Sequence, residues 1–236
     1  MAVKRETREI FRYAAPFAMW IALQTALPAT AWAYAVRTVL TALVGVWCLW
    51  RGEARSCTTD GIGRACRDHA GAAALVAAVG LLVGVLVTVL WIAPEFSTFY
   101  RTWFCWPLGS LPAPSTAPSP YEPAVCGWTL TIMKLIGSAF VIAPVEEVFF
   151  RSFLYRWLQK RDFLSVPLSR FDLSAFLWMV FLFTLEHDRP LAAAVAGAFY
   201  GLAAIRFGLA SAVVAHVTTN LLLAIYVIHQ GAWAFW

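Results

Sequence analysis

Residues 71–92 contain no charged side chain, and this single feature constrains the fold more than any other. The stretch reads GAAALVAAVGLLVGVLVTVLWI, and a helix needs about 20 consecutive apolar residues to cross a bilayer. The rest of the chain agrees, because 61% of all residues are hydrophobic and only 13% are charged. A soluble domain carries about 25% charged residues, so the composition excludes a large soluble domain.

Further apolar runs extend over 13–27, 35–50, 125–143, 173–185, 191–205 and 209–228. The 236 residues therefore predict an all-α, polytopic transmembrane helix bundle of about seven spans, with six to eight as the range. The N-terminal run follows four basic residues and resembles a signal peptide, with Ala31-Trp32-Ala33 as a cleavage site. We favour a retained first span, because Pro16 and Gln24 interrupt its apolar core.

Two polar segments divide the chain. Residues 51–70 contain four arginines and predict a solvated cytoplasmic loop, whereas 93–123 is rich in proline and aromatic residues and predicts an outer loop. We expect residues 1–124 to form N-terminal membrane helices and residues 125–236 to form a second helix bundle.

The distribution of Lys and Arg predicts the orientation. The N-terminus and the 51–70 loop carry four each and the 151–170 stretch carries five, but the 93–123 loop carries one. By the positive-inside rule the N-terminus is cytoplasmic, and we expect a multi-pass protein of the bacterial cytoplasmic membrane. The net charge of +5 reflects this topology, so we expect contact with the lipid bilayer and no nucleic-acid partner.

Acids and histidines in apolar segments are costly and suggest function, and three groups of them occur in the last hundred residues. In the first group, Glu147 and Arg151 are four residues apart and can pair on a helix. Glu146 then lies about 100° round the helix and can face a cavity as a general base.

The second and third groups follow the same spacing. Phe183 shares a helix face with His187, and His216 shares one with Asn220. By counting residues from the inner loop, we expect Glu146 and His216 at middle depth but His187 nearer the outer end. A proline break at Pro144 or a water-filled cavity would bring the groups level.

These motifs, EExxxR at 146–151, FxxxH at 183–187 and HxxxN at 216–220, resemble the CAAX-protease and bacteriocin-processing family of glutamate-type intramembrane endopeptidases. The resemblance covers roughly residues 140–236. Around 151–154, 162–168 and 231–236 the chain is similar to a bacterial subgroup associated with exosortase systems. It departs from the family in having Ser152 after the motif arginine and Glu186 beside His187.

The resemblance implies peptide-bond hydrolysis in a membrane-anchored protein or peptide substrate. Glu146 and His187 would activate water, His216 and Asn220 would form the oxyanion site, and Glu147 with Arg151 would support the motif helix. We expect no cofactor. The alternative cofactor is zinc, held by Glu146, His187 and His216, although the sequence lacks HExxH.

Two other functions stay open at this point. A catalytically silent relative would act as a membrane immunity or assembly factor and would tolerate Glu146→Ala. A proton-coupled transporter would use the same buried acids as a proton relay and would show ion-coupled flux.

Overall fold

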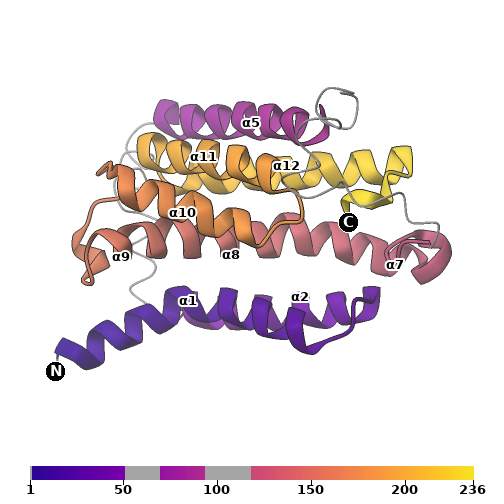
Figure 1. Ribbon diagram of the computed structural model, residues 1–236, viewed down its shortest axis with the longest axis horizontal. Helices are drawn as coiled ribbons and strands as arrows, with labels where there is room; N and C mark the ends of the chain where they lie inside the picture. The colour runs from indigo at the N-terminus through magenta and orange to yellow at the C-terminus, as the bar shows by residue number, and fades with distance from the viewer. Residues whose placement is uncertain (1, 51–69, 94–117) are drawn as a thin grey trace.

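The computed structural model describes residues 2–50, 70–93 and 118–236, and Figure 1 shows its helices lying roughly side by side along one axis. The predicted loops at 51–70 and 93–123 lie mostly outside these residues. The long α-helices are α1 (Ala2–Ala26), α2 (Ala31–Trp50), α5 (Ala70–Ile92), α7 (Pro123–Ile136), α10 (Leu173–Leu185), α11 (Pro190–Phe207) and α12 (Leu209–Gln230). The short ones are α8 (Ala143–Glu147) and α9 (Tyr155–Gln159), with 3-10 turns η4 (Phe163–Ser165) and η5 (Trp233–Phe235).

The described part of the chain is all helical, which confirms the predicted fold class. Its helical segments are α1, α2, α5, the continuous α7-to-α9 segment, α10, α11 and α12, which makes seven. Five of them are long and apolar enough to cross a membrane. Among the apolar helices of the described residues, α10 is the short one, and the point where it ends determines where His187 lies.

The proline at 144 does not break its helix. The chain is helical from Pro123 to Gln159 except for a kink at Gly127 (φ 76°, ψ 157°), and π-helical segments η2 (Gly137–Ile142) and η3 (Val148–Leu154) lie on either side of α8. Proline has no N–H to donate within a helix, and here it stands at the start of α8, directly after a π-turn in which the N–H of Ala143 bonds the carbonyl of Ser138. The motif helix therefore carries its acids on an unbroken but locally widened backbone.

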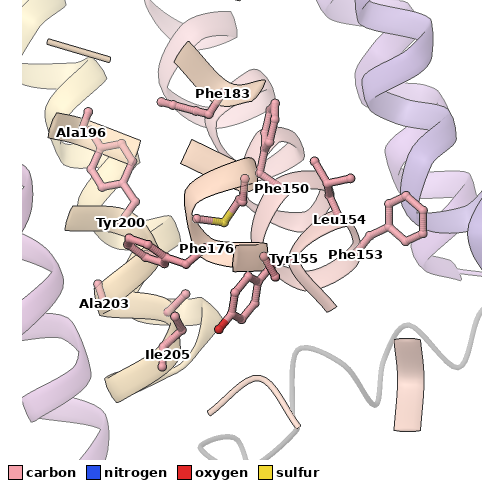
Figure 2. Packing of buried hydrophobic residues seen from close by; sticks show 14 of the residues in the cluster. Phe150, Phe153, Leu154, Tyr155, Phe176, Phe183, Ala196, Tyr200, Ala203 and Ile205 are labelled. Atoms are coloured by element: carbon pink, nitrogen blue, oxygen red, sulfur yellow. The ribbon is translucent and has the colours of Figure 1, made fainter. Parts of the chain in front are cut away.

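Aromatic side chains from three helices fill the centre of the bundle (Figure 2). Phe150 and Phe153 of η3 pack with Phe176 of α10 and Tyr200 of α11. The helix α11 approaches closely because small residues face its neighbours, and a side chain added at Gly197 would meet the Phe183 ring at 3.0 Å.

The helices α5 and α12 are packed together even more closely. A Cβ atom added at Gly84 would lie 2.6 Å from the Ala215 carbonyl oxygen, and the Thr219 hydroxyl donates to the Gly84 carbonyl at 3.0 Å. This contact fixes the height of α12, which carries His216. On the other side of the bundle, α1 contributes Phe17, whose ring stacks on Phe149 at 4.3 Å.

Candidate active site

The two motif glutamates point to different partners, as their spacing predicted. Glu147 pairs with Arg151 at 3.0 Å, and both side chains are at most 1% exposed. Arg151 also donates to the Gly197 carbonyl of α11 at 3.2 Å and lies over the Phe183 ring. The ion pair therefore joins the motif helix to α10 and α11, while Glu146 remains available to a cavity.

His216 lies between the two glutamates. Its Nδ1 is 2.9 Å from the Glu147 carboxylate, and its Nε2 is 3.7 Å from Glu146. The Tyr200 ring stacks on it at 4.7 Å, which holds the imidazole plane. Because the Glu147 carboxylate can only accept, Nδ1 carries the hydrogen of this contact and Nε2 faces the cavity, where it can accept a hydrogen bond or take up a proton.

His187 lies in the short break that follows α10, at 186–189. Its Nδ1–H donates to the Phe183 carbonyl at 2.8 Å, which leaves the Nε2 lone pair available when the ring is neutral. Burial lowers the pKa of His187 to about 4, so the ring is neutral at physiological pH. A neutral imidazole of this kind can accept a proton or a hydrogen bond from water.

The expected difference in depth between His187 and the other motifs is wrong. His187 lines the same cavity as Glu146, His216 and Asn220. The reason is the length of α10, since its 13 residues extend only about 20 Å, less than a full span. The helix ends inside the bundle, and its motif histidine is thereby level with the glutamates.

Asn220 projects from α12 one turn beyond His216, and both line the cavity. Its side-chain amide donates to the Ser138 carbonyl in η2 at 2.9 Å. An amide nitrogen carries two hydrogens, so the second remains available to a bound group. The bond to Ser138 fixes which way the amide faces.

Glu186 joins the site in a way that its sequence position did not reveal. Its carboxyl group is hydrogen-bonded to that of Glu146, and two carboxyl groups in such contact must share a proton. Burial raises the pKa of Glu186 well above the usual range for a carboxylic acid. The unusual acid beside the motif histidine was the only sequence signal for this contact.

These side chains enclose a cavity of about 190 Å³. Its other walls are aromatic and apolar, with one further cation, Lys134. The lining residues are Trp91, Lys134, Ser138, Glu146, Phe183, His187, Ala196, Tyr200, His216, Thr219, Asn220, Leu223, Phe235 and Trp236.

Within the described ranges, no three His, Cys, Asp or Glu side chains are gathered as a metal site. Glu146, His187 and His216, the set predicted as the zinc alternative, line one cavity without converging on a point. The Nδ1 of His216 and of His187 are both engaged, so only their Nε2 atoms are available as ligands.

The architecture and the site together define a polytopic membrane protein with a buried Glu, His and Asn constellation. Residues 128–222 match the family model described as "Rce1-like: Type II CAAX prenyl endopeptidase Rce1-like". The matched segment holds all three motifs, so this part of the chain is similar to that family of membrane proteases. No curated protein and no solved structure matches the chain.

Proposed function

We propose that the protein is an intramembrane endopeptidase that hydrolyses a peptide bond in a membrane-anchored protein or peptide. The observation that carries the proposal is the single cavity shared by Glu146, His187, His216 and Asn220, which come from three separate segments of the chain. The Glu147 and Arg151 pair holds the motif helix and does not line that cavity.

In the proposed reaction, Glu146 and the Nε2 atom of His187 position a water molecule and remove its proton as it attacks the scissile carbonyl. The oxyanion that forms accepts a hydrogen bond from the Asn220 amide, and His216 adds a second donor through Nε2 when its ring takes up a proton. Glu147 stabilises the charge on His216 through Nδ1. Glu146, which is hydrogen-bonded to Glu186, then returns a proton to the leaving amine.

We further propose that the N-terminus is cytoplasmic and that the protein lies in a bacterial cytoplasmic membrane. We also propose that it is related to the subgroup associated with exosortase systems. The first placement is supported by the excess of Lys and Arg in the N-terminal, 51–70 and 151–170 segments. A reporter fused before residue 1 tests it directly, because a cytoplasmic fluorophore is protected from an external quencher in intact cells.

The main experiment compares the membrane proteomes of cells that carry wild type, Glu146→Gln or His187→Ala. We expect one protein terminus to appear only with wild type. His229→Ala is the matched control, because His229 is exposed at the end of α12 and lies outside the cavity. Unchanged termini in both cavity variants, at normal expression, would favour the silent immunity or assembly factor.

Metal dependence is tested on the purified protein. We expect cleavage to survive dialysis against a chelator, with no stoichiometric zinc by mass spectrometry. If the chelator abolishes cleavage and added zinc restores it, the reaction depends on a metal held by Glu146, His187 and His216. Ion-coupled flux in vesicles that Glu146→Gln abolishes would instead identify a transporter.

A further inference from the structure

The polar side chains of α2 follow one face of the helix, although α2 is long and apolar enough to cross a membrane. This polar face consists of Tyr34, Arg37, Thr38, Thr41 and Cys48, with Gly45 between the last two. At about 100° per residue these positions lie within an arc of about 100°, and four of them are at most 3% exposed. The other side of α2 is apolar and exposed, with Val39 at 48% and Leu43 at 60%. The polar face is therefore turned towards α1, α7 and η2, against which α2 packs (Figure 1).

The threonines of this face differ from the other buried threonines that the structure describes. The hydroxyl groups of Thr88 and Thr219 donate to the carbonyl one turn earlier in their own helices, at 2.8 and 3.1 Å. Those of Thr38 and Thr41 are buried but bond to no described protein group. The Tyr34 hydroxyl interacts with that of Thr38, but the two form no hydrogen bond of normal length and angle. Buried hydroxyl groups of this kind are normally bonded to ordered water.

The spacing of these groups suits a row of water molecules. On a helix, side chains three or four residues apart have Cβ atoms about 5–6 Å apart. A water molecule that makes two hydrogen bonds of about 2.8 Å spans this distance between two oxygen atoms. The steps from Tyr34 to Thr38 and from Thr38 to Thr41 are four and three residues. Single water molecules can therefore link successive hydroxyl groups along the polar face.

Two cations lie at the end of this row that is nearest the catalytic cavity. Lys134 lines that cavity, and its ammonium nitrogen is 4.1 Å from the centre of the Tyr34 ring and 4.7 Å from that of Tyr121. The Arg37 guanidinium carbon is 4.1 Å from the Trp20 ring and 5.0 Å from the Tyr34 ring, and its buried Nε makes no hydrogen bond. Neither cation pairs with an acid in the described part of the chain. Stacking on rings offsets only part of the cost of burying them, and water can offset more.

The row meets the wall of the catalytic cavity at η2. A Cβ atom added at Gly137 would lie 2.5 Å from the Thr38 hydroxyl oxygen, so this hydroxyl lies directly against the glycine. The next residue, Ser138, lines the cavity, and its carbonyl accepts the hydrogen bond of Asn220. The polar face of α2 therefore reaches the backbone segment that orients the proposed oxyanion donor.

The other end of the polar face opens into a separate cavity of about 310 Å³ between α1 and α2. Its lining residues are Arg8, Phe11, Arg12, Trp47 and Cys48. The Arg8 side chain is exposed, and arginine head groups stay hydrated at a membrane boundary. Between this cavity and Thr41, a Cβ atom added at Gly45 would meet no described atom within 4 Å, so the helix surface is open there. In the proposed orientation this entrance is cytoplasmic.

We propose that the polar face of α2 is a water path, which joins this entrance to the catalytic cavity and supplies the water consumed in hydrolysis. The proposal rests on the proposed function and gives a role to α2, which contributes no residue to the lining of the catalytic cavity. Each cleaved peptide bond takes up one water molecule, whose hydroxyl joins the carbonyl carbon and whose remaining hydrogen goes to the leaving amine. The hydrocarbon around the bundle holds no water to replace it.

Cysteine reactivity measures hydration of the path without a client. In a protein whose five native cysteines are replaced by alanine, a single cysteine is placed at Thr38 or Thr41, or at Val39 or Leu43 on the exposed face as the matched control. Iodoacetamide alkylates the thiolate, which forms where water solvates it. In lipid vesicles we expect Thr38→Cys and Thr41→Cys to react at least about tenfold faster than the two controls, as followed by the mass of the intact protein.

Cleavage of a client tests whether this water reaches the reaction. The double variant Thr38→Val/Thr41→Val keeps the shape of both side chains and removes both hydroxyl groups. We expect kcat to fall about threefold to tenfold with KM unchanged, and Thr38→Ser/Thr41→Ser to restore most of the rate. Thr88→Val is the matched control, because the Thr88 hydroxyl is buried but bonded within α5 and lies outside the cavity. Thermal unfolding of each variant establishes that it is folded.

The outcomes separate this proposal from the proposed function. Equal alkylation on the two faces of α2 would overturn the water path, whatever the activity of the protein. Rapid alkylation at Thr38→Cys and Thr41→Cys with an unchanged kcat in the double valine variant would overturn the supply of water to the reaction. A client still cleaved by Glu146→Gln would contradict the proposed function instead, and the alkylation rates would still decide whether α2 carries water.

Discussion

The two charged regions of the cavity differ in how their charges are balanced. Around Glu146 and Glu147 every charge has a partner, namely Arg151, His216 or the shared proton with Glu186. Around Lys134 two cations face aromatic rings and no acid among the described residues. The difference teaches that the charges of the first region are balanced within the fold, whereas those of the second are offset only by aromatic rings among the described residues.

Pre-organisation is what an intramembrane hydrolytic site requires. Donors that are already oriented stabilise developing charge without rearrangement, and here Asn220 is fixed by Ser138 while His216 is fixed by Tyr200 and Glu147. The region around Lys134 has a different balance, since stacking on aromatic rings offsets only part of the cost of burying its two cations. The two regions would therefore respond to mutation in opposite ways.

The largest effect is expected for Glu146→Gln. An amide in place of the carboxylate removes the proposed general base, and we expect the rate of client cleavage to fall about 10² to 10⁴-fold. Glu122→Gln is the control, because Glu122 lies before α7 and outside the cavity. Initial rates with purified protein and client measure the effect, and a loss of less than threefold would remove Glu146 from the chemistry.

Arg151→Met tests the paired region through stability. Removing one partner of a buried ion pair leaves Glu147 uncompensated, and such changes cost about 3–5 kcal/mol. Unfolding in mixed micelles measures the free energy, and the double variant Glu147→Gln/Arg151→Met should recover part of the loss. A loss below about 1 kcal/mol would show that the pair does not hold the motif helix.

Lys134→Met should have the opposite sign. It removes a cation that has no acidic partner among the described side chains, so we expect the free energy of unfolding to rise by about 1 kcal/mol or stay unchanged. The same micelle unfolding assay measures it, with Lys160→Met as the control outside the cavity. Destabilisation as large as that of Arg151→Met would abolish the contrast between the two regions.

The sequence predicted the paired region better than the unpaired one, for physical reasons. The spacing of Glu147 and Arg151 places them on one helix face, so their contact is a local property that a helical repeat reveals. The height of His187 depends on where α10 ends, and the contact of Glu186 with Glu146 joins segments 40 positions apart. Such contacts depend on tertiary packing.

Lys134 was missed for the same reason. It is a single lysine in an apolar run, and nothing nearby in the sequence shows that Tyr34, Arg37 and Tyr121 surround it. The sequence also did not show that the helix continues through Pro144, because this continuity depends on the π-turn that precedes the proline. Helices and motifs were therefore predictable, but the second half of the cavity was not.

The smallest expected effect is a pH dependence of stability that arises from Glu186 in the paired region. The raised pKa of Glu186 means that the folded protein keeps a proton that the unfolded chain has already released. Stability from this group is therefore fully present below the ordinary carboxyl pKa and decreases as pH rises towards the raised value. His187, with a pKa near 4, contributes the opposite slope only below its ordinary pKa of 6.5.

Between pH 6.5 and 8 the contribution of His187 is constant, so substitution of Glu186 isolates the contribution of that carboxyl group. We expect the unfolding temperature of wild type to fall across this window, relative to Glu186→Gln, which cannot release the proton. Parallel slopes for wild type and Glu186→Gln would mean that Glu186 shares no proton with Glu146. The paired region would then be a simple network of Glu, His and Arg side chains.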